Sequence, residues 1–452
     1  MRACRQAGIM AASTLAQHGR CGAVGRGLAN GSCYGTRDNK NTDAGTMRLT
    51  ATGICLTDEA AADLLEAVHS REPALGLTHG FYRYPARFSP RFVRAAIEAL
   101  TEPGDLVLDP FVGGGATLVE ARVLGRPAIG VDINELAVFV SRVKTTVLSE
   151  GDLCAVHSWV QGLGERLNLR RPPIRAHKWI SRGYQRNISG KNTWPIRKTL
   201  ELALADLGRL QSSQQRRFAR CILLKTAQWG LDCRKTVPSA ADFRQKLHAN
   251  VDFMCEEARN FGARAREADG FHASTAPFRT LCMHRSVIGL DKDPAVANTV
   301  PPTLILTSPP YPGVHVLYHR WQVDGRRETP APFWIANSDD SRGASFYTLG
   351  DRGQKELRSY YQQMRDALGS LARLAGETTL LVQVIGFSDP AWQLPRYLQV
   401  AAEAGFSELE VPALANCSDG RLWRRIPNRK WYASQRGPIP SSREVVLFHR
   451  LR

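Results

Sequence analysis

The chain has 452 residues, which is long enough for two or three domains and a large apolar core without disulfide or metal cross-links. Its 60 Lys and Arg residues outnumber its 42 Asp and Glu residues, giving a formal net charge of +18 and a sequence pI of about 9.8. This charge favours a polyanionic partner such as nucleic acid, although a soluble basic protein without one can share it. No apolar run is long enough to cross a bilayer, so we expect no contact with a membrane.

The ten cysteines are scattered, with no CxxC pair and no Cys/His cluster at zinc-finger spacing. This pattern argues against disulfide-rich secreted proteins and against zinc fingers. We therefore expect reduced thiols, a cytoplasmic location and no metal site.

Residues 1–46 are rich in Gly, Ala, Ser, Asn and Arg and contain no acidic residue before Asp38. Because they also lack hydrophobic periodicity, we expect a disordered tail, or a reading frame that begins upstream of a true start at Met47. An arginine-bearing and acid-poor start is also typical of an organelle transit peptide, and this alternative stays open.

The segment over 79–90 is aromatic and basic and contains Tyr84, Pro85 and Phe88. It precedes an expected helix over 91–100. Aromatic residues in front of a helix most often pack into a core, and this is the simpler interpretation of the segment.

A strand ending at Asp109 is expected to run into a glycine-rich turn and then a helix. The turn contains Pro110, Phe111, Gly113 and Gly115. Its glycines let the backbone approach a ligand closely, and the amino terminus of the helix offers free N–H groups. Alone, this pattern is only a weak indication of a cofactor.

About twenty residues later, a second expected strand ends in Asp132 and Ile133. An acid at that place can accept two hydrogen bonds from a ribose diol. The two patterns together indicate a nucleoside-bearing cofactor more strongly than either alone. The glycine spacing matches neither GxGxxG nor GxxxxGK[ST], which argues against nicotinamide and nucleoside triphosphate cofactors.

Residues 151–290 separate these strands from the remaining sheet elements and are read as an inserted domain. They carry 24 Lys and Arg against 11 Asp and Glu, so +13 of the chain's +18 lies here. The segments over 170–179 and 181–194 mix basic and aromatic residues, which suit contact with phosphates and base stacks. We expect a largely helical region that recognises DNA; a helical bundle with a solvated basic face is the alternative.

The stretch over 304–311 is a short apolar run that ends abruptly in Ser308, Pro309, Pro310 and Tyr311. The prolines force a turn at the carboxyl end of an expected buried strand. In open α/β sheets, ligands bind outside those ends, so we expect the chemistry here.

Three segments in this order resemble the motifs of S-adenosylmethionine-dependent amino-DNA methyltransferases: DPFVGGG at 109–115, GVD at 130–132 and TSPPY at 307–311. The SPPY version resembles the N4-cytosine branch, and the segment around Tyr84, Pro85 and Phe88 resembles the motif that closes over the methionine end of the cofactor. The acidic motif expected to contact the adenine has no clean match; Asp291 and Asp293 are the candidates.

The resemblance implies an α/β, Rossmann-like class I methyltransferase fold with a mostly parallel seven-stranded sheet. The cofactor-binding half would occupy 47–150, the inserted DNA target-recognition region 151–290 and the catalytic half 291–452. S-adenosylmethionine would contact Tyr84, Pro85, Phe88 and the turn and strand-end residues Asp109, Pro110, Phe111, Gly113, Gly115, Asp132 and Ile133. The catalytic residues would be Ser308, Pro309, Pro310 and Tyr311, acting on a flipped cytosine in double-stranded DNA.

The same resemblance implies a prokaryotic, monomeric, nucleoid-associated enzyme, often accompanied by a restriction endonuclease. N6-adenine methylation of DNA is the nearest alternative, RNA methylation a more distant one, and a DNA-binding protein with a degenerate cofactor site the alternative from another class. C5-cytosine methylation is disfavoured because that family carries its thiolate on a Pro-Cys pair, and no cysteine here follows a proline.

Overall fold

The computed structural model describes residues 47–50, 52–70, 72, 75–85, 88–170, 177–271, 276–313, 320–323, 325, 327–340, 347, 349–350, 355–425 and 443–452. The predicted tail over 1–46 lies outside the described residues, as do residues 171–176 of the first basic aromatic segment.

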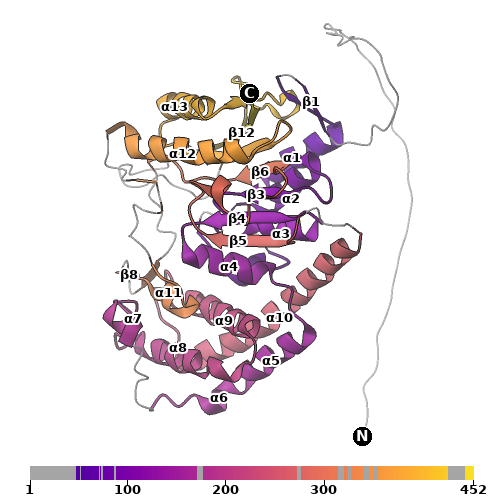
Figure 1. The fold of residues 1–452 in the computed structure, drawn as a ribbon. Helices are drawn as coiled ribbons and strands as arrows, with labels where there is room; N and C mark the ends of the chain where they lie inside the picture. Colours follow the sequence, from indigo (N-terminus) through magenta and orange to yellow (C-terminus); the bar gives the residue numbers. More distant parts are fainter. Residues whose placement is uncertain are drawn as a thin grey trace, which may run out of the picture. The chain divides into compact units, whose positions relative to one another are not determined.

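One central sheet of eight strands dominates the fold (Figure 1). Its strands are β3 (Val107–Asp109), β4 (Ala128–Asp132), β5 (Thr280–His284), β6 (Leu304–Thr307), β9 (Leu380–Gly386), β10 (Phe406–Glu408), β11 (Leu422–Arg425) and β12 (Arg443–Leu451). Seven of them follow the order β10-β12-β9-β6-β3-β4-β5, and β11 pairs with β12 as an additional strand. The five strands from β9 to β5 are parallel, whereas β12 runs antiparallel to its neighbours. The predicted Rossmann-like α/β fold is confirmed.

The chain order in this sheet reverses between β3 and β6. From β3 the chain proceeds through β4 to β5 at one edge and then returns to β6 on the other side of β3. Such a switch point opens a crevice at the carboxyl ends of the strands, where ligands of α/β proteins bind. Asp109, Asp132 and Thr307 are the last residues of β3, β4 and β6, so the predicted site residues meet at this crevice.

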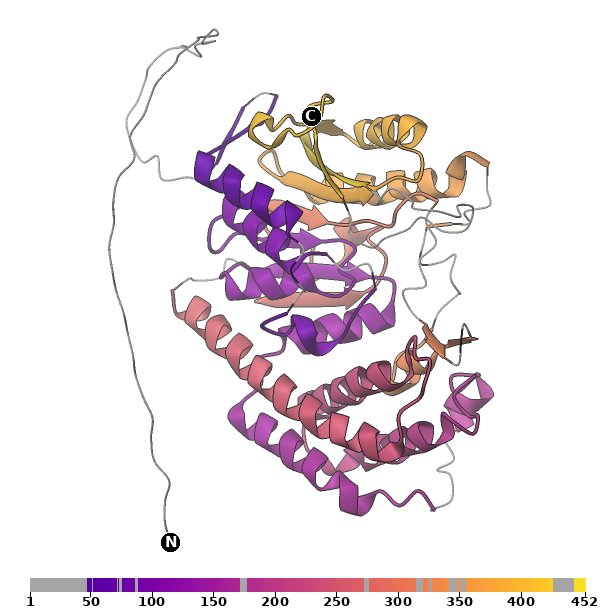
Figure 2. The same cartoon turned by 180° about the vertical axis from the view of Figure 1, so that it is seen from behind.

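Both faces of the sheet are covered by helices (Figures 1 and 2). Because side chains alternate along a strand, Val107 packs toward one helical layer and Leu108 toward the other. The first layer consists of α1 (Asp58–His69), α2 (Pro90–Leu100) and α3 (Ala116–Val123), and the second of α12 (Arg358–Leu374) and α13 (Pro390–Glu403).

A helical layer follows the sheet on the side of α4 (Glu135–Thr145), which contacts β4 and β5 (Figure 1). It contains α5 (Glu150–Gln161), α6 (Leu163–Arg166), α7 (His177–Ser181), α8 (Trp194–Asp206), α9 (Ser213–Leu231), α10 (Ala240–Phe271) and α11 (Ala331–Ala336). One apolar cluster joins these helices to α4, with Phe218 of α9, Phe243 of α10 and Val140 of α4 all buried in it. The layer therefore shares a core with the helix that follows Asp132.

In its described residues, the predicted insert over 151–290 forms the helices α5 to α10, the last of which ends at Phe271, and then β5. The structure places β5 in the central sheet, paired in parallel with β4. The insert therefore ends before β5 and not at residue 290. The sequence alone did not assign this short strand to the sheet, because its partner β4 lies about 150 residues earlier in the chain.

Polar residues set the starts of two helices in this layer. Ser149 and Asp152 form a reciprocal capping box at α5, and Ser212 and Gln215 form another at α9. Each box satisfies two N–H groups that a helix start leaves without partners.

Smaller elements complete the fold. They are the hairpins β1 (Met47–Leu49) with β2 (Ile54–Leu56) and β7 (Trp321–Val323) with β8 (Arg327–Thr329), and the 3-10 helices η1 (His79–Phe81), η2 (Leu207–Arg209), η3 (Leu290–Lys292), η5 (Lys355–Leu357) and η6 (Pro412–Leu414). None of the helices in the described ranges is both long and apolar enough to span a membrane.

Candidate active site

Glycines shape the turn between β3 and α3. Gly113 and Gly115 have φ angles of +47° and +77°, which residues with a side chain rarely adopt. A Cβ atom at Gly115, the N-cap of α3, would lie 2.7 Å from the Oγ of Ser141 on α4. Glycine at this position therefore lets α3 begin in close contact with α4.

Asp132 closes the turn from the neighbouring strand. Its Oδ2 accepts a hydrogen bond from the Gly113 N–H at 2.9 Å, and its Oδ1 accepts one from the Asn134 N–H at 2.9 Å. Burial raises the pKa of Asp132 to about 6, although both hydrogen bonds act in the opposite direction. Each carboxylate oxygen has a second lone pair, so Asp132 can still accept hydrogen bonds from a ligand.

The buried side chain of Asp109 links three elements behind this turn by hydrogen bonds. Its Oδ2 accepts from the Thr117 hydroxyl at 2.6 Å and its Oδ1 from the Thr307 hydroxyl at 2.7 Å, which connects β3 to α3 and β6. The N–H of Phe111 also donates to Oδ1, at 3.1 Å. Burial raises the pKa of Asp109 to about 6.

The tetrapeptide follows β6, which lies beside β3. Ser308 is half-buried and its Oγ lies 3.3 Å from the hydroxyl of the buried Tyr311. The Tyr360 hydroxyl of α12 donates to the Pro310 carbonyl at 2.7 Å. The ring of Tyr311 lies so close to Gly386 of β9 that a Cβ there would be 2.9 Å from it. Neighbouring elements thus hold this segment in place.

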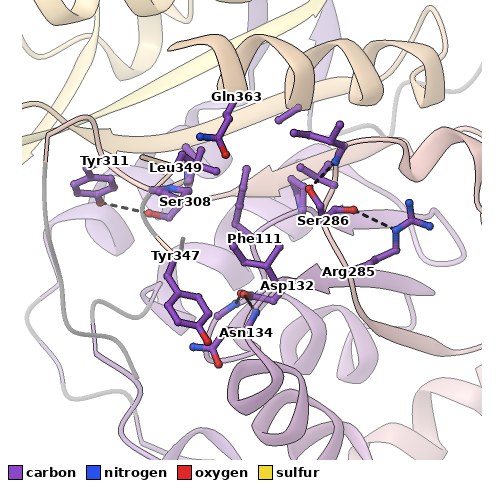
Figure 3. A pocket seen from close by; sticks show the side chains of 18 of the residues that line it. Phe111, Asp132, Asn134, Arg285, Ser286, Ser308, Tyr311, Tyr347, Leu349 and Gln363 are labelled. Atoms are coloured by element: carbon purple, nitrogen blue, oxygen red, sulfur yellow. Dashed lines mark hydrogen bonds between the residues drawn. The ribbon is translucent and has the colours of Figure 1, made fainter. Parts of the chain in front are cut away.

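These residues line one pocket (Figure 3). Ten of the predicted site residues lie in its wall: Tyr84, Pro110, Phe111, Gly113, Asp132, Ile133, Ser308, Pro309, Pro310 and Tyr311. Figure 3 shows Ser308 and Tyr311 on one side, with Asp132 and Asn134 lower in the pocket. The structure thus brings most of the cofactor and catalytic candidates to a single cavity.

Four predicted cofactor residues do not line this pocket. The carboxylate of Asp109 is bonded to its two threonines, and Gly115 faces Ser141. The ring of Phe88 packs on Phe92 of α2, with 5.7 Å between their centroids. Pro85 is the fourth.

Nine lining residues were missing from the prediction: Asn134, Arg285, Ser286, Val287, Ile288, Tyr347, Leu349, Gln363 and Ala367. Asn134 caps α4 through the Leu136 N–H and donates to the Tyr84 hydroxyl at 3.0 Å. An asparagine two residues after the strand-end acid is a recognisable capping signal. Residues 285–288 directly follow β5, and they were missed because that strand was assigned to the insert.

Neither acid considered for the adenine contact lines the pocket. Asp291, in η3, accepts from Arg373 Nε at 2.7 Å, and this bond lowers its pKa. Asp293 pairs with Arg285. Both acids therefore form ion pairs around the loop after β5, and Arg285 and Ser286 are the polar residues of that loop that line the cavity.

A basic aromatic cluster lies in the helical layer: Lys178, Trp179, Arg182 and Tyr184. The Lys178 Nζ lies 4.9 Å from the Trp179 ring centroid, and the Arg182 guanidinium 5.2 Å from that of Tyr184. The Tyr184 hydroxyl accepts from the Asp340 N–H at 2.8 Å. The preceding N–H, of Asp339, donates to Glu135, the residue after Asn134. The cluster is thus connected to the helix that begins at the pocket.

Comparison with known proteins identifies a related family. Residues 62–141 match the model of a family described as DNA methylase. This segment runs from α1 to α4 and includes the glycine turn and Asp132, but not the tetrapeptide.

Three curated relatives share short segments with the chain. A Type II methyltransferase M.MjaII of Methanocaldococcus jannaschii is 33% identical over 20% of this chain and 17% of its own length. The Type II methyltransferase M.MvaI of Kocuria varians is 35% identical over 17% and 18%, respectively. A tRNA (guanine(10)-N2)-dimethyltransferase of M. jannaschii is 43% identical over 12% and 15%. The chain thus spans less than a fifth of the length of each of these relatives.

The methyltransferase relationship implies S-adenosylmethionine as the methyl donor. The pocket suits such a molecule in the polar and apolar groups that line it. Asp132 offers acceptors for ribose hydroxyls, while Phe111, Val287 and Ile288 offer an apolar surface for a base. Ile288 is 40% exposed, and a ligand in the pocket would reduce this exposure. No group of three or more potential ligating side chains that could hold a metal occurs among the residues described above.

Proposed function

We propose that this protein methylates the exocyclic N4 of cytosine in double-stranded DNA, with S-adenosylmethionine as the donor. The observation that carries the proposal is the shared pocket: Ser308 and Pro309 line the same pocket as Asp132 and Gly113 of the glycine turn. The residues assigned as acceptors for an amine and for a ribose therefore line one cavity.

The chemistry requires an amine to act as a nucleophile. The lone pair of a cytosine amine is delocalised into the ring, so the site must favour the pyramidal amine whose lone pair faces the methyl group. The Pro309 carbonyl and the Ser308 hydroxyl are acceptors suited to the two amine hydrogens. Hydrogen bonds to both would localise the lone pair on nitrogen.

When bound, the cofactor supplies a methyl group on a positively charged sulfur. Ser308 and Pro309 would hold N4 toward that methyl group, and the proton that N4 gives up on methylation would pass to solvent. The amine attacks directly, so no covalent bond between protein and base is needed. The roles of the chain are to orient the base, accept the amine hydrogens and exclude water.

A base paired inside a duplex cannot reach this pocket, so the target must be flipped out. We assign stacking on the extruded base to Tyr311, whose ring is held against Gly386. Flipping costs a few kcal/mol, which stacking and phosphate contacts would offset.

We assign DNA contact to the helical layer formed by α5 to α10. Its Lys178–Tyr184 cluster combines exposed cations with aromatic rings and is connected to α4 through Asp339 and Asp340. Exposed Arg186 and Lys191 extend the basic surface. The strand β5 and residues 285–288 belong with the cofactor-binding half in this proposal.

Cytosine is preferred over adenine because the tetrapeptide begins with Ser308, the first residue typical of the N4-cytosine branch. The match of residues 62–141 to the family described as DNA methylase supports a DNA amine as the substrate. The tRNA methyltransferase among them makes an RNA amine a separate outcome to examine. As two of the named relatives are Type II methyltransferases, we also propose a role beside a restriction endonuclease, as a monomer on DNA.

The test is transfer of labelled methyl groups to DNA by the wild-type protein and by Ser308→Ala and Tyr311→Ala variants. Both variants should lose roughly 100-fold or more in kcat, as expected for groups that act on the reacting atoms. Their affinity for the cofactor should change little. Normal activity in both variants would show that the chemistry lies elsewhere.

A further inference from the structure

A chain of hydrogen bonds leads from the pocket into the sheet. Ser308 Oγ lies 3.3 Å from the Tyr311 hydroxyl, which donates to Oε1 of Glu444 (Figure 3 shows the first contact). Glu444 belongs to β12 and is only 2% exposed. Its other oxygen, Oε2, accepts from Arg424 Nε of β11 at 2.6 Å.

The donors and acceptors in this chain fix its direction. A carboxylate paired with arginine only accepts, so Tyr311 gives its single proton to Glu444. Burial, followed by the Glu444 charge, raises the pKa of Tyr311 well above its ordinary value, so the phenol keeps this proton. The Tyr311 oxygen can then only accept from Ser308. The Ser308 proton therefore points toward Tyr311, and its lone pairs remain for a ligand.

We propose that Glu444, held by Arg424, is a positioning residue that keeps the Ser308 hydroxyl a hydrogen-bond acceptor for the target amine. This inference rests on the proposed amine methylation. It assigns a role to a residue that lies outside the pocket wall and 133 residues from Tyr311 in the sequence. Through Tyr311, β12 controls the polarity of the catalytic hydroxyl.

The variant Glu444→Gln should reverse the chain while keeping its shape. Arg424 can only donate, so it holds the amide oxygen, and the amide nitrogen then faces Tyr311. Tyr311 must accept from that nitrogen and turn its own proton toward Ser308. The Ser308 proton would then point into the pocket and face the amine hydrogens, so the hydroxyl could no longer accept a hydrogen bond from the amine. We expect kcat to fall about 10- to 100-fold, the loss typical of one charge-assisted hydrogen bond, with cofactor affinity unchanged.

A double-mutant cycle separates this role from a structural one. Tyr311→Phe keeps the ring but interrupts the chain, so adding Glu444→Gln to it should change kcat by less than about twofold. If Glu444 only stabilises the sheet, the same factor is lost in both backgrounds.

Ser308→Ala provides a second cycle that does not depend on the folding of the Glu444 variant. Tyr311→Phe should lower kcat when Ser308 is present and have little further effect in the Ser308→Ala protein. Equal losses in both backgrounds would overturn the inference.

Glu408→Gln is the matched control. Glu408 lies on β10 and also binds an arginine, since its oxygens accept from Arg421 at 2.7 and 2.8 Å. It lies outside the pocket, so its loss should leave kcat unchanged.

The outcomes distinguish the inference from the function on which it rests. If the wild-type protein binds the cofactor but transfers no methyl group to a nucleic-acid amine, both are overturned. If the wild-type protein methylates DNA and Glu444→Gln retains kcat within about twofold, the positioning role is wrong and the proposed function stands.

Discussion

Binding of S-adenosylmethionine should weaken as the pH falls from 7 to 5, because Asp132 gains a proton in that range. Its pKa is raised to about 6 by burial in the cofactor-free protein. Only the carboxylate form accepts hydrogen bonds from both ribose hydroxyls. Affinity is therefore highest above this pKa and is lost as the pH falls through it.

The size of the effect follows from the ionised fraction. With a pKa of about 6, roughly nine tenths of the Asp132 side chains are ionised at pH 7 and roughly one tenth at pH 5. If the protonated form binds the ribose poorly, the dissociation constant rises about tenfold across these two pH units.

Calorimetric titration of the cofactor at several pH values measures this change. Asp132→Asn should bind weakly at pH 7 and show a nearly flat profile. Asp109 has a pKa of about 6 as well but lies outside the pocket, so Asp109→Asn should retain most of the pH dependence. A wild-type dissociation constant that is the same at pH 5 and pH 7, or an equal slope in Asp132→Asn, would refute the assignment of Asp132 to the ribose.

Three further predictions concern stability and DNA binding. Gly115→Ala should lower the free energy of unfolding in urea by about 2–4 kcal/mol, from the left-handed backbone and the close contact with α4. The control Gly420→Ala, at φ +72° with nothing within 4 Å of the added atom, should lose only about 1–2 kcal/mol; equal losses would contradict the contact. Asp109→Ala should cost about 2–4 kcal/mol in the same assay, since it leaves two buried threonine hydroxyls without their acceptor; an unchanged midpoint would show that these bonds do not matter. Arg186→Ala should weaken DNA binding and reduce the salt dependence by about one ion, whereas Arg365→Ala on α12, paired with Glu403, should not.

The part of the site that was predictable consists of strand ends with strong local patterns. Glycines before a helix, an acid after a strand and two prolines after an apolar run each constrain the backbone locally. The order of these segments then placed Gly113, Asp132 and Ser308 at one edge of a parallel sheet. The structure brings all three to one pocket.

The part of the site that could not be predicted depends on contacts between segments that are distant in the sequence. Asp109 follows the same local pattern as a ligand-binding acid, and only the packing of α3 and β6 shows that its oxygens bind Thr117 and Thr307. Residues 285–288 line the pocket because β5, which follows the helices α5 to α10 in the sequence, pairs directly with β4. Glu444 gave no local signal either, since its role arises from the pairing of β12 with β9 beside Tyr311.

The central claim, methylation of a DNA amine at N4 of cytosine, is tested most directly by identifying the product. The purified protein is incubated with labelled S-adenosylmethionine and duplex DNA, the DNA is digested to nucleosides, and these are separated and identified by mass spectrometry. The account predicts label in N4-methylcytosine. Label confined to N6-methyladenine, or an unlabelled DNA in the presence of bound cofactor, would contradict it.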